Sequence, residues 1–217
     1  EHGLQIVTGD QPAVRNCVVH HNAAAGIVID GDKKEGGDGL IDQPIVENNV
    51  LYANGRLKAG TLRPRDERGR ELPIASLRYG NAAICGDGLE RGMIRNNLIY
   101  RNYGGGIVLY RQHAARAGRH NRVLHNTIYL SADCGSAFGI YLALMSQDTS
   151  VYNNVVVTSQ GPALYIGEGS SKGIQSDYNV FFRLDNKDPI RRDKQTMPLK
   201  DWQNMYRVDR NSISLKV

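Results

Sequence analysis

A six-residue motif returns along this chain at intervals of roughly two dozen residues once local insertions are removed. Its clearest copies are Glu-Asn-Asn-Val-Leu-Tyr at 47–52 and Arg-Asn-Asn-Leu-Ile-Tyr at 95–100. The copies begin at Arg15, Glu47, Arg95, Leu124, Tyr152 and Asp177. All but the last are followed by a second apolar segment led by Gly or Ala, as in Gly-Ile-Val-Ile at 26–29. Repetition at this length predicts a solenoid in which each copy forms one coil.

Polar and apolar residues alternate within each copy, which is the period of a β-strand and not of a helix. The fifth motif residue then faces the core, and the predicted core column is Val19, Leu51, Ile99, Ile128, Val156 and Phe181. We expect the second Asn of each motif to hydrogen-bond its side-chain amide to the equivalent residue of the next coil. This predicted ladder consists of Asn49, Asn97, Asn126, Asn154 and Asn179, with Cys17 in the same position of the first coil.

The motif resembles that of the right-handed parallel β-helix repeat proteins of the pectate-lyase-like superfamily, whose coils read approximately N-N-x-I-Y-x-N followed by G-I. The resemblance covers about Gly3 to Phe182. It implies an all-β, right-handed parallel β-helix of about six coils over residues 1–182, and a secreted or periplasmic location. The same scaffold hosts polysaccharide lyases, glycoside hydrolases, epimerases, phage tailspikes and non-catalytic adhesins. The motif therefore predicts a fold more sharply than an activity.

The two ends of the chain give separate expectations. Residues 183–217 are expected to form a C-terminal cap or tail, in which a short amphipathic helix places Leu199, Trp202 and Tyr206 on one face. At the other end, the apolar segment at 3–7 already has the pattern of a strand, so little sequence remains to cover the first coil. Two explanations are open: either the chain is a fragment of a longer protein, or a further domain or subunit covers that end.

Composition excludes several classes of partner. The chain of 217 residues carries a formal net charge of +5, but no recognised nucleic-acid motif accompanies this modest excess, and nucleic acid is not expected as a partner. No apolar run approaches the roughly 18 residues that would predict insertion into a membrane.

The three cysteines, Cys17, Cys85 and Cys134, follow no disulfide or zinc spacing and are expected to be free thiols.

Three insertions interrupt the repeat, and sites on repeat scaffolds usually lie on such loops. The first, 30–43, separates carboxylates by glycines, which indicates either a calcium site with Asp30 and Asp32 as ligands or a flexible acidic turn. Calcium is thus a candidate ligand, although no cofactor is required. The second, 56–79, is highly charged and is either a solvated loop or a flap over a substrate.

The third insertion, 111–121, brings arginines and imidazoles directly after an apolar strand. β-Elimination at a uronate needs a base for the C5 proton and a cation for the carboxylate. The catalytic candidates are Tyr110, Arg111 and His113, with His20 and His21 as competitors, and the candidate substrate cations are Arg116 and Arg119. The alternative is an ordinary solvated basic loop.

Two further sets of residues bear on function. A glycosidase would use paired carboxylates, and Asp30, Asp87 and Asp133 are able to approach one another across coils. An outer column of Tyr52, Tyr100 and Tyr129, beside His20, suits stacking on sugar rings, although tyrosine is also simply a good strand residue.

Two functions follow as hypotheses. The first is a carbohydrate-active β-helix that acts on a polysaccharide, preferably an anionic one, by lyase or glycoside hydrolase chemistry. The second is a non-catalytic β-helix module that binds glycans or builds a larger surface protein. Convergence of titratable groups from the loops in one place would favour the first hypothesis.

Overall fold

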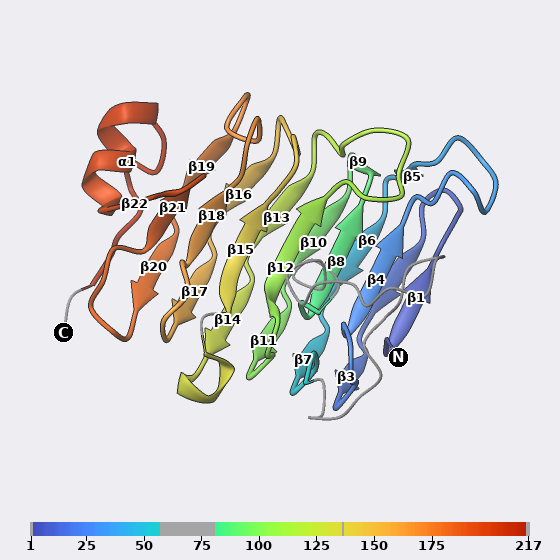
Figure 1. Cartoon of the computed structure of the whole chain (residues 1–217), viewed down its shortest axis with the longest axis horizontal. Helices are drawn as coiled ribbons and strands as arrows, with labels where there is room; N and C mark the ends of the chain where they lie inside the picture. Colours follow the sequence, from blue (N-terminus) through green and yellow to red (C-terminus); the bar gives the residue numbers. More distant parts are fainter. Residues whose placement is uncertain (1, 57–80, 136, 216–217) are drawn as a thin grey trace.

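The computed structural model describes residues 2–56, 81–135 and 137–215, and the chain winds there as a parallel β-helix with three sheets (Figure 1). Sheet A contains, in spatial order, β1 (Leu4–Ile6), β4 (Ile27–Asp30), β8 (Ile84–Asp87), β12 (Gly105–Tyr110), β15 (Phe138–Leu142), β18 (Leu164–Ile166), β21 (Ile190–Arg192) and β22 (Gln195–Met197). Sheet B contains β2 (Ala13–Arg15), β6 (Ile45–Glu47), β10 (Met93–Arg95), β13 (Arg122–Leu124), β16 (Ser150–Tyr152) and β19 (Gln175–Asp177). Sheet C contains β3 (Val18–His20), β7 (Val50–Tyr52), β11 (Leu98–Tyr100), β14 (Thr127–Leu130), β17 (Val155–Thr158) and β20 (Val180–Arg183).

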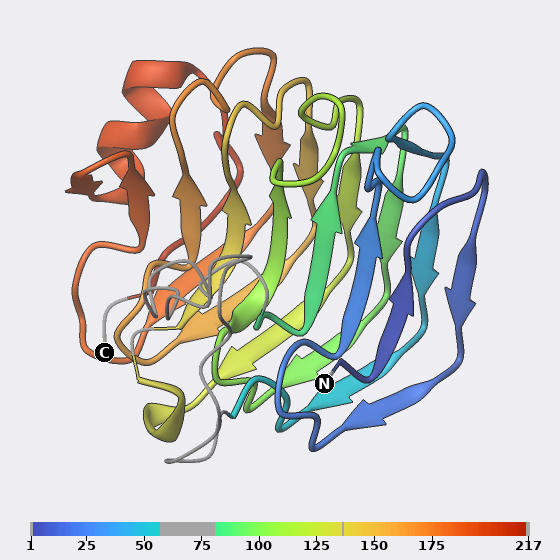
Figure 2. The same ribbon diagram turned by 45° about the vertical axis from the view of Figure 1, so that its right-hand side comes forward.

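Every pairing between described strands of these sheets is parallel except the one between β21 and β22 (Figure 2). Two short strands, β5 (Ile41–Asp42) and β9 (Leu89–Glu90), form a small parallel pair beside the coils. A 3₁₀ turn, Ala132–Cys134, and one helix, α1 (Leu199–Tyr206), complete the regular structure. The predicted all-β parallel β-helix with a short C-terminal helix is therefore confirmed.

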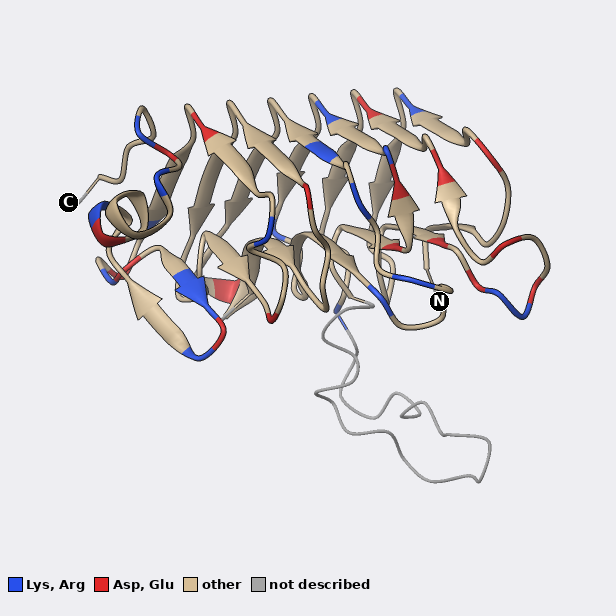
Figure 3. Cartoon of the chain, turned by 90° about the horizontal axis from the view of Figure 1, so that it is seen from above, with Lys and Arg blue, Asp and Glu red and all other residues tan. Residues whose placement is uncertain are grey.

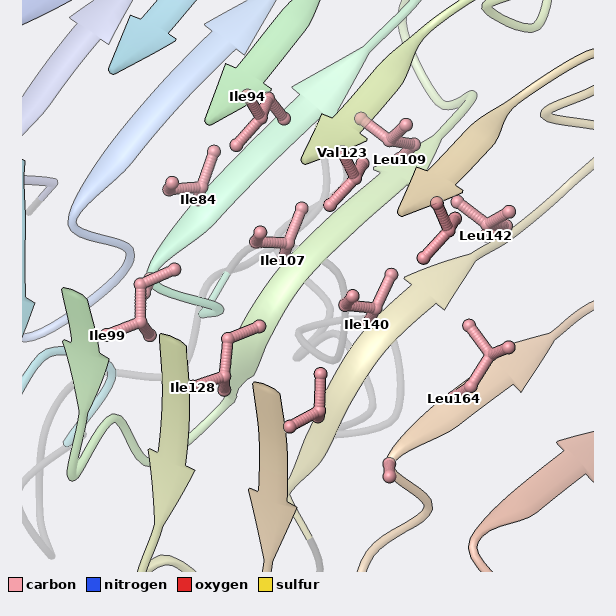
Figure 4. Packing of buried hydrophobic residues seen from close by; sticks show 14 of the residues in the cluster. Ile84, Ile94, Ile99, Ile107, Leu109, Val123, Ile128, Ile140, Leu142 and Leu164 are labelled. Atoms are coloured by element: carbon pink, nitrogen blue, oxygen red, sulfur yellow. The ribbon is translucent and has the colours of Figure 1, made fainter. Parts of the chain in front are cut away.

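The core is built from columns of equivalent residues. Leu51, Ile99, Ile128, Val156 and Phe181 are fully buried and lie in register on sheet C, as predicted, while Val19 at the first coil is only partly buried. On sheet A, Ile84, Ile107, Ile140 and Leu164 form the facing column (Figure 4). Each coil thus buries its apolar residues against the coils before and after it.

The predicted asparagine ladder is present at the turn between sheets B and C. Side-chain Nδ2 atoms donate to the Oδ1 of the next coil over 2.9–3.0 Å from Asn49 through Asn97, Asn126 and Asn154 to Asn179. Each Nδ2 also donates to a backbone carbonyl of the neighbouring coil, as Asn126 does to Ile94 O at 3.0 Å. A second ladder, Asn22 to Asn54 to Asn102, follows the outer column of sheet C.

The first residue of each motif pair adopts a left-handed backbone. Asn16, Asn48, Asn96, His125, Asn153 and Tyr178 all have φ between 53° and 58°. Asn tolerates this region better than other residues with a Cβ, because its short polar side chain bonds locally. The two residues of the Asn-Asn pair therefore have different roles: the first forms the left-handed turn, and the second forms the ladder.

This geometry predicts a stabilising substitution at His125, which is exposed and has φ of 53°. His125→Asn should raise the free energy of unfolding by roughly 0.5 kcal/mol, because it restores the residue type that the left-handed turn favours. Urea denaturation followed by circular dichroism measures the change. A decrease in stability would mean that the turn does not limit the choice of residue here.

Parallel pairing continues beyond position 182, where the repeat motif ends. Strand β21 pairs with β18 on sheet A, and Ile213 forms a parallel bridge with Val180 on sheet C. Ser212 Oγ accepts the backbone N–H of Asn179 at 2.8 Å, so a serine closes the asparagine ladder. The predicted helix covers this end, with Leu199 and Trp202 buried and Tyr206 against the Trp202 ring.

Two further expectations concern thiols and membranes. Cys17, Cys85 and Cys134 carry thiols that are not joined in disulfides, as their spacing predicted, and the structure buries Cys85 and Cys134. In the part of the chain that the structure describes, no helix is both long and apolar enough to cross a bilayer.

Candidate functional site

Two buried carboxylates lie side by side on the outer face of sheet A. Asp30 ends β4 and Asp87 ends β8, and the register pairs them with each other and Asp87 with Tyr110 on β12. Successive residues of a strand alternate between faces, so the preceding Ile29 and Leu109 face the core while these three side chains face outward. Asp30 is 6% exposed and Asp87 is 0% exposed. The register between successive coils therefore places the two acidic side chains next to each other at one edge of sheet A.

The first and third insertions fold over these strand ends and contact each other. Asp32 forms an antiparallel bridge with Ala114, and the N–H of Ala115 donates to Gly39 O at 2.9 Å. Gly88, which follows Asp87, has φ of 68°, and a Cβ placed there would lie 2.3 Å from that of Ala114. Glycine at 88 thus lets the third insertion approach the sheet.

His113 of the third insertion completes the cluster. Its Nδ1 lies 2.9 Å from Oδ2 of Asp30, a residue 83 positions away in the sequence. An ionised carboxylate only accepts hydrogen bonds, so Nδ1 carries the proton and, in the neutral ring, Nε2 is left as the basic nitrogen. Among the described residues nothing hydrogen-bonds Nε2, and the side chain is 45% exposed. The arrangement is a base oriented by a buried acid.

Asp87 binds the backbone of the same loop. The N–H of Gln112 donates to both carboxylate oxygens, at 2.9 and 3.0 Å, and the N–H of His113 donates to Oδ2 at 2.7 Å. Oδ2 also lies 3.9 Å from Nδ1 of His113. In contrast, Oδ1 of Asp30 is buried and has no hydrogen-bond partner among the described residues.

Burial and nearby charges shift the pKa values of His113 and Asp87. Burial alone would lower the pKa of His113, but the hydrogen bond to Asp30 and the charges of Asp30, Asp87 and Asp32 outweigh it and hold that pKa above its ordinary value of 6.5. Burial raises the pKa of Asp87, the nearby Asp30 charge adds to this, and the two backbone N–H groups partly offset it. The imidazole therefore keeps a proton to higher pH than a free histidine.

The same three side chains also form a possible metal-ligand set. One ligand atom from each of Asp30, Asp87 and His113 lies within 4.8 Å of the others. Calcium prefers oxygen ligands only, so an imidazole in the set does not fit it, whereas zinc or manganese accept this combination. Asp32, the other predicted calcium ligand, lies outside the group, and its Oδ1 accepts the N–H of Lys34 at 2.8 Å.

Other predicted residues of the third insertion have different surroundings. Tyr110 is buried at 4% exposure in an outer-face apolar cluster with Cys85 and Val108, and burial first, then nearby negative charges, raises the pKa of its hydroxyl. Arg111 is exposed, two residues before His113. Arg116 pairs with Glu90 at 3.2 Å, and Arg119 is exposed.

The predicted aromatic column lies on sheet C, away from the cluster. His20 stacks on Tyr52 and Tyr52 on Tyr100, with ring centroids 4.8 and 5.0 Å apart and interplanar angles of 10° and 7°. Both faces of the Tyr52 ring are therefore covered by its neighbours, and Tyr129, in register with Tyr100, is 44% exposed. Nδ1 of His20 lies 2.8 Å from Nδ1 of His21. This geometry favours the structural explanation of the column over sugar stacking.

Of the three aspartates that could pair across coils, two do. Asp133 lies in the 3₁₀ turn after β14 and contacts Ser131 and Arg101, so it is not part of the cluster. The signal for the pair was present in the repeat, because Asp30 and Asp87 each stand three positions after the first Ile of the second strand. The second insertion, 56–79, lies outside the described residues apart from Arg56.

Charges of both signs are interspersed over the described coils (Figure 3). Several are paired on sheet B, where Glu47 lies 2.6 Å from both Arg15 and Arg95. At Glu47 two arginines share one buried carboxylate, whereas in the Asp30, Asp87 and His113 cluster two buried carboxylates lie beside one accessible imidazole.

Comparisons with known proteins add little to this geometry. No known family and no curated protein matches the sequence. Among solved structures, the chain is similar to the tailspike of Pseudomonas phage phi297, with 13% sequence identity and a TM-score of 0.42. The similarity covers 84% of this chain and 31% of the tailspike, so the chain spans less than a third of that protein's length.

Proposed function

We propose that this β-helix cleaves an anionic polysaccharide by β-elimination, with His113 as the base. The observation that supports it is the convergence of Asp30, Asp87 and His113 from three coils onto one outer edge of sheet A. Such clustering of titratable groups favours an enzyme over a non-catalytic module. It also agrees with the resemblance of the repeat to pectate-lyase-like proteins, and by that resemblance with a location outside the cytoplasm.

Each role follows from exposure and charge. His113 is 45% exposed, has no partner for Nε2 among the described residues and takes the proton at that nitrogen, while Asp30 holds Nδ1 and stabilises the imidazolium that forms. The exposed Arg111 is the nearest cation in the sequence and neutralises the substrate carboxylate. This neutralisation makes the C5 proton of a uronate acidic enough to be removed.

The proposed step balances without any further reactant. His113 Nε2 removes the C5 proton, the C5–H electron pair forms the C4–C5 double bond, and the C4–O bond breaks. The departing oxygen takes up a proton from solvent. The products are a chain ending in an unsaturated uronate and a chain with a new reducing end.

Two-carboxylate glycoside hydrolysis fits this site less well. It requires both carboxyl groups to face the sugar across the scissile bond. Asp87 is completely buried and Asp30 nearly so, and both are engaged with the third insertion. The only member of the cluster that reaches solvent freely is the imidazole.

The experiment is incubation of the protein with a panel of anionic and neutral polysaccharides, with and without a chelator. We expect ultraviolet absorbance from unsaturated uronates on an anionic substrate, and no loss on chelation. New reducing ends without absorbance would indicate hydrolysis, and glycan binding without either product would indicate a non-catalytic module. Activity that disappears with chelator and returns with zinc or manganese would mean that the cluster works through a metal.

Arg111 offers a separate test of the substrate's charge. Arg111→Ala should raise the KM or lower the kcat for a polyuronate about 10- to 100-fold, because the developing charge on the carboxylate loses its counter-ion. Arg111→Lys should recover part of the activity. The control is Arg122→Ala, an exposed arginine on β13 of sheet B, which should retain wild-type activity. Equal effects of the two alanine variants would contradict the role of Arg111.

A further inference from the structure

The Asp87 carboxylate accepts hydrogen bonds from residues that are distant in the sequence, and not from its own turn. The donors are the backbone N–H groups of Gln112 and His113, which lie 25 and 26 residues away and belong to the next coil's insertion. Two consecutive N–H groups bound to one carboxylate fix the orientation of the peptide between them. They therefore fix the direction in which the Cα–Cβ bond of His113 leaves the backbone.

The burial of Asp87 limits what it does. With 0% of its surface exposed, its carboxylate cannot touch a polysaccharide bound outside the coil, so it is not a catalytic residue in the sense of contacting the reacting atoms. A buried carboxylate is nevertheless costly unless its charge is compensated. Here the compensation comes from the very loop that carries His113.

We infer that Asp87 is the positioning residue of the site: it holds the 112–113 backbone so that Nδ1 of His113 meets Asp30 and Nε2 faces solvent. This inference rests on the proposed function for its effect on rate, but its structural part stands on the contacts alone. Without Asp87 the imidazole would lose its fixed approach to Asp30. Loss of alignment of about 1 Å in a reacting group costs up to about 100-fold in rate.

The Asp87→Asn substitution removes the charge and one acceptor oxygen of this side chain while keeping its shape. Asp87→Asn keeps the volume but supplies only one acceptor oxygen, and its NH₂ group would face an N–H that now donates to the carboxylate. The negative charges of three carboxylates raise the pKa of His113: Asp30 on β4, Asp32 in the loop after β4, and Asp87 on β8. Removing the Asp87 charge should therefore lower the pKa of His113.

The test combines nuclear magnetic resonance of the His113 ring with steady-state kinetics. In Asp87→Asn we expect a downward shift of the His113 titration midpoint and a kcat about 10- to 100-fold lower, with KM changed much less. Glu90→Gln is the matched control, because buried Glu90 contacts Arg116 of the same insertion but not His113. The control should leave the His113 midpoint and kcat near wild type.

A second measurement works even where Asp87→Asn does not fold. In the wild-type protein, hydrogen exchange at the Gln112 and His113 amides should be slowed well beyond that of the Arg111 amide, because a buried carboxylate binds them. Unprotected amides, or an Asp87→Asn protein with unchanged His113 midpoint and kcat, would overturn the inference. An active His113→Gln variant would instead refute the proposed function, while exchange and titration would still decide the role of Asp87.

Discussion

Replacing His113 by Gln should reduce kcat/KM for cleavage of an anionic polysaccharide by about 10²–10⁴-fold, the usual contribution of a positioned general base. Glutamine retains a polar group of similar reach but cannot accept the C5 proton. The side chain is 45% exposed, so the substitution should leave the fold, followed by circular dichroism, unchanged. Initial rates of unsaturated-uronate formation measure the effect.

His120 provides the control for this substitution. It is another exposed imidazole of the third insertion, with no hydrogen bond or ion pair to the Asp30, Asp87 and His113 cluster. His120 has φ of 56°, so Asn is the appropriate replacement for its left-handed backbone. His120→Asn should keep wild-type rates. Equal losses in both variants would show that any change to the loop, and not loss of the base, explains the effect.

Removing one member of the asparagine ladder should have the largest effect on stability. Asn126→Ala leaves the N–H and Nδ2 of Asn97 without the Oδ1 acceptor of residue 126. It also removes the side-chain donor to Ile94 O and one of the two donors to Asn154 Oδ1, which keeps only the backbone N–H of residue 126. All these groups are buried, so the free energy of unfolding should fall by about 3–5 kcal/mol. Denaturation by urea, followed by circular dichroism, measures the loss.

Asn153 is the matched control within the same turn type. It is the first residue of its Asn-Asn pair, is exposed, and has φ of 56°. Asn153→Gly should change stability by less than about 1 kcal/mol, because glycine adopts this backbone freely but is more flexible when unfolded. If Asn126→Ala costs no more than Asn153→Gly, the ladder is not a major source of stability.

The repeat allowed the fold to be predicted because equivalent positions of every coil have the same environment and therefore select the same kind of residue. Alternation of polar and apolar residues assigned Ile99 and Ile128 to the core, and the column of asparagines assigned their ladder. The left-handed turn was not predicted, since it concerns backbone conformation at the first Asn, which side-chain periodicity does not report. The end of the ladder was also missed, because Ser212 replaces the asparagine whose recurrence defined the motif.

The candidate site was predicted only in part, for a physical reason. His113 was selected from its chemistry, but its partner Asp30 lies 83 residues away and meets it through the folding of two insertions. Insertions have no periodicity from which such a contact follows. Asp87 was considered as half of a carboxylate pair, whereas its role as acceptor for the Gln112 and His113 backbone depends on burial that the sequence does not show.

The pH dependence of kcat/KM tests the central claim that Asp30 and His113 act together as the base. The neutral imidazole is the active form, so the rate should rise with pH through the His113 pKa, which lies above 6.5 in the folded protein. In Asp30→Asn, which removes the main group that raises this pKa, the midpoint should move to lower pH and the maximal rate should fall. A rate that is independent of pH from mildly acidic to mildly alkaline solution, or the same midpoint in both proteins, would contradict the account.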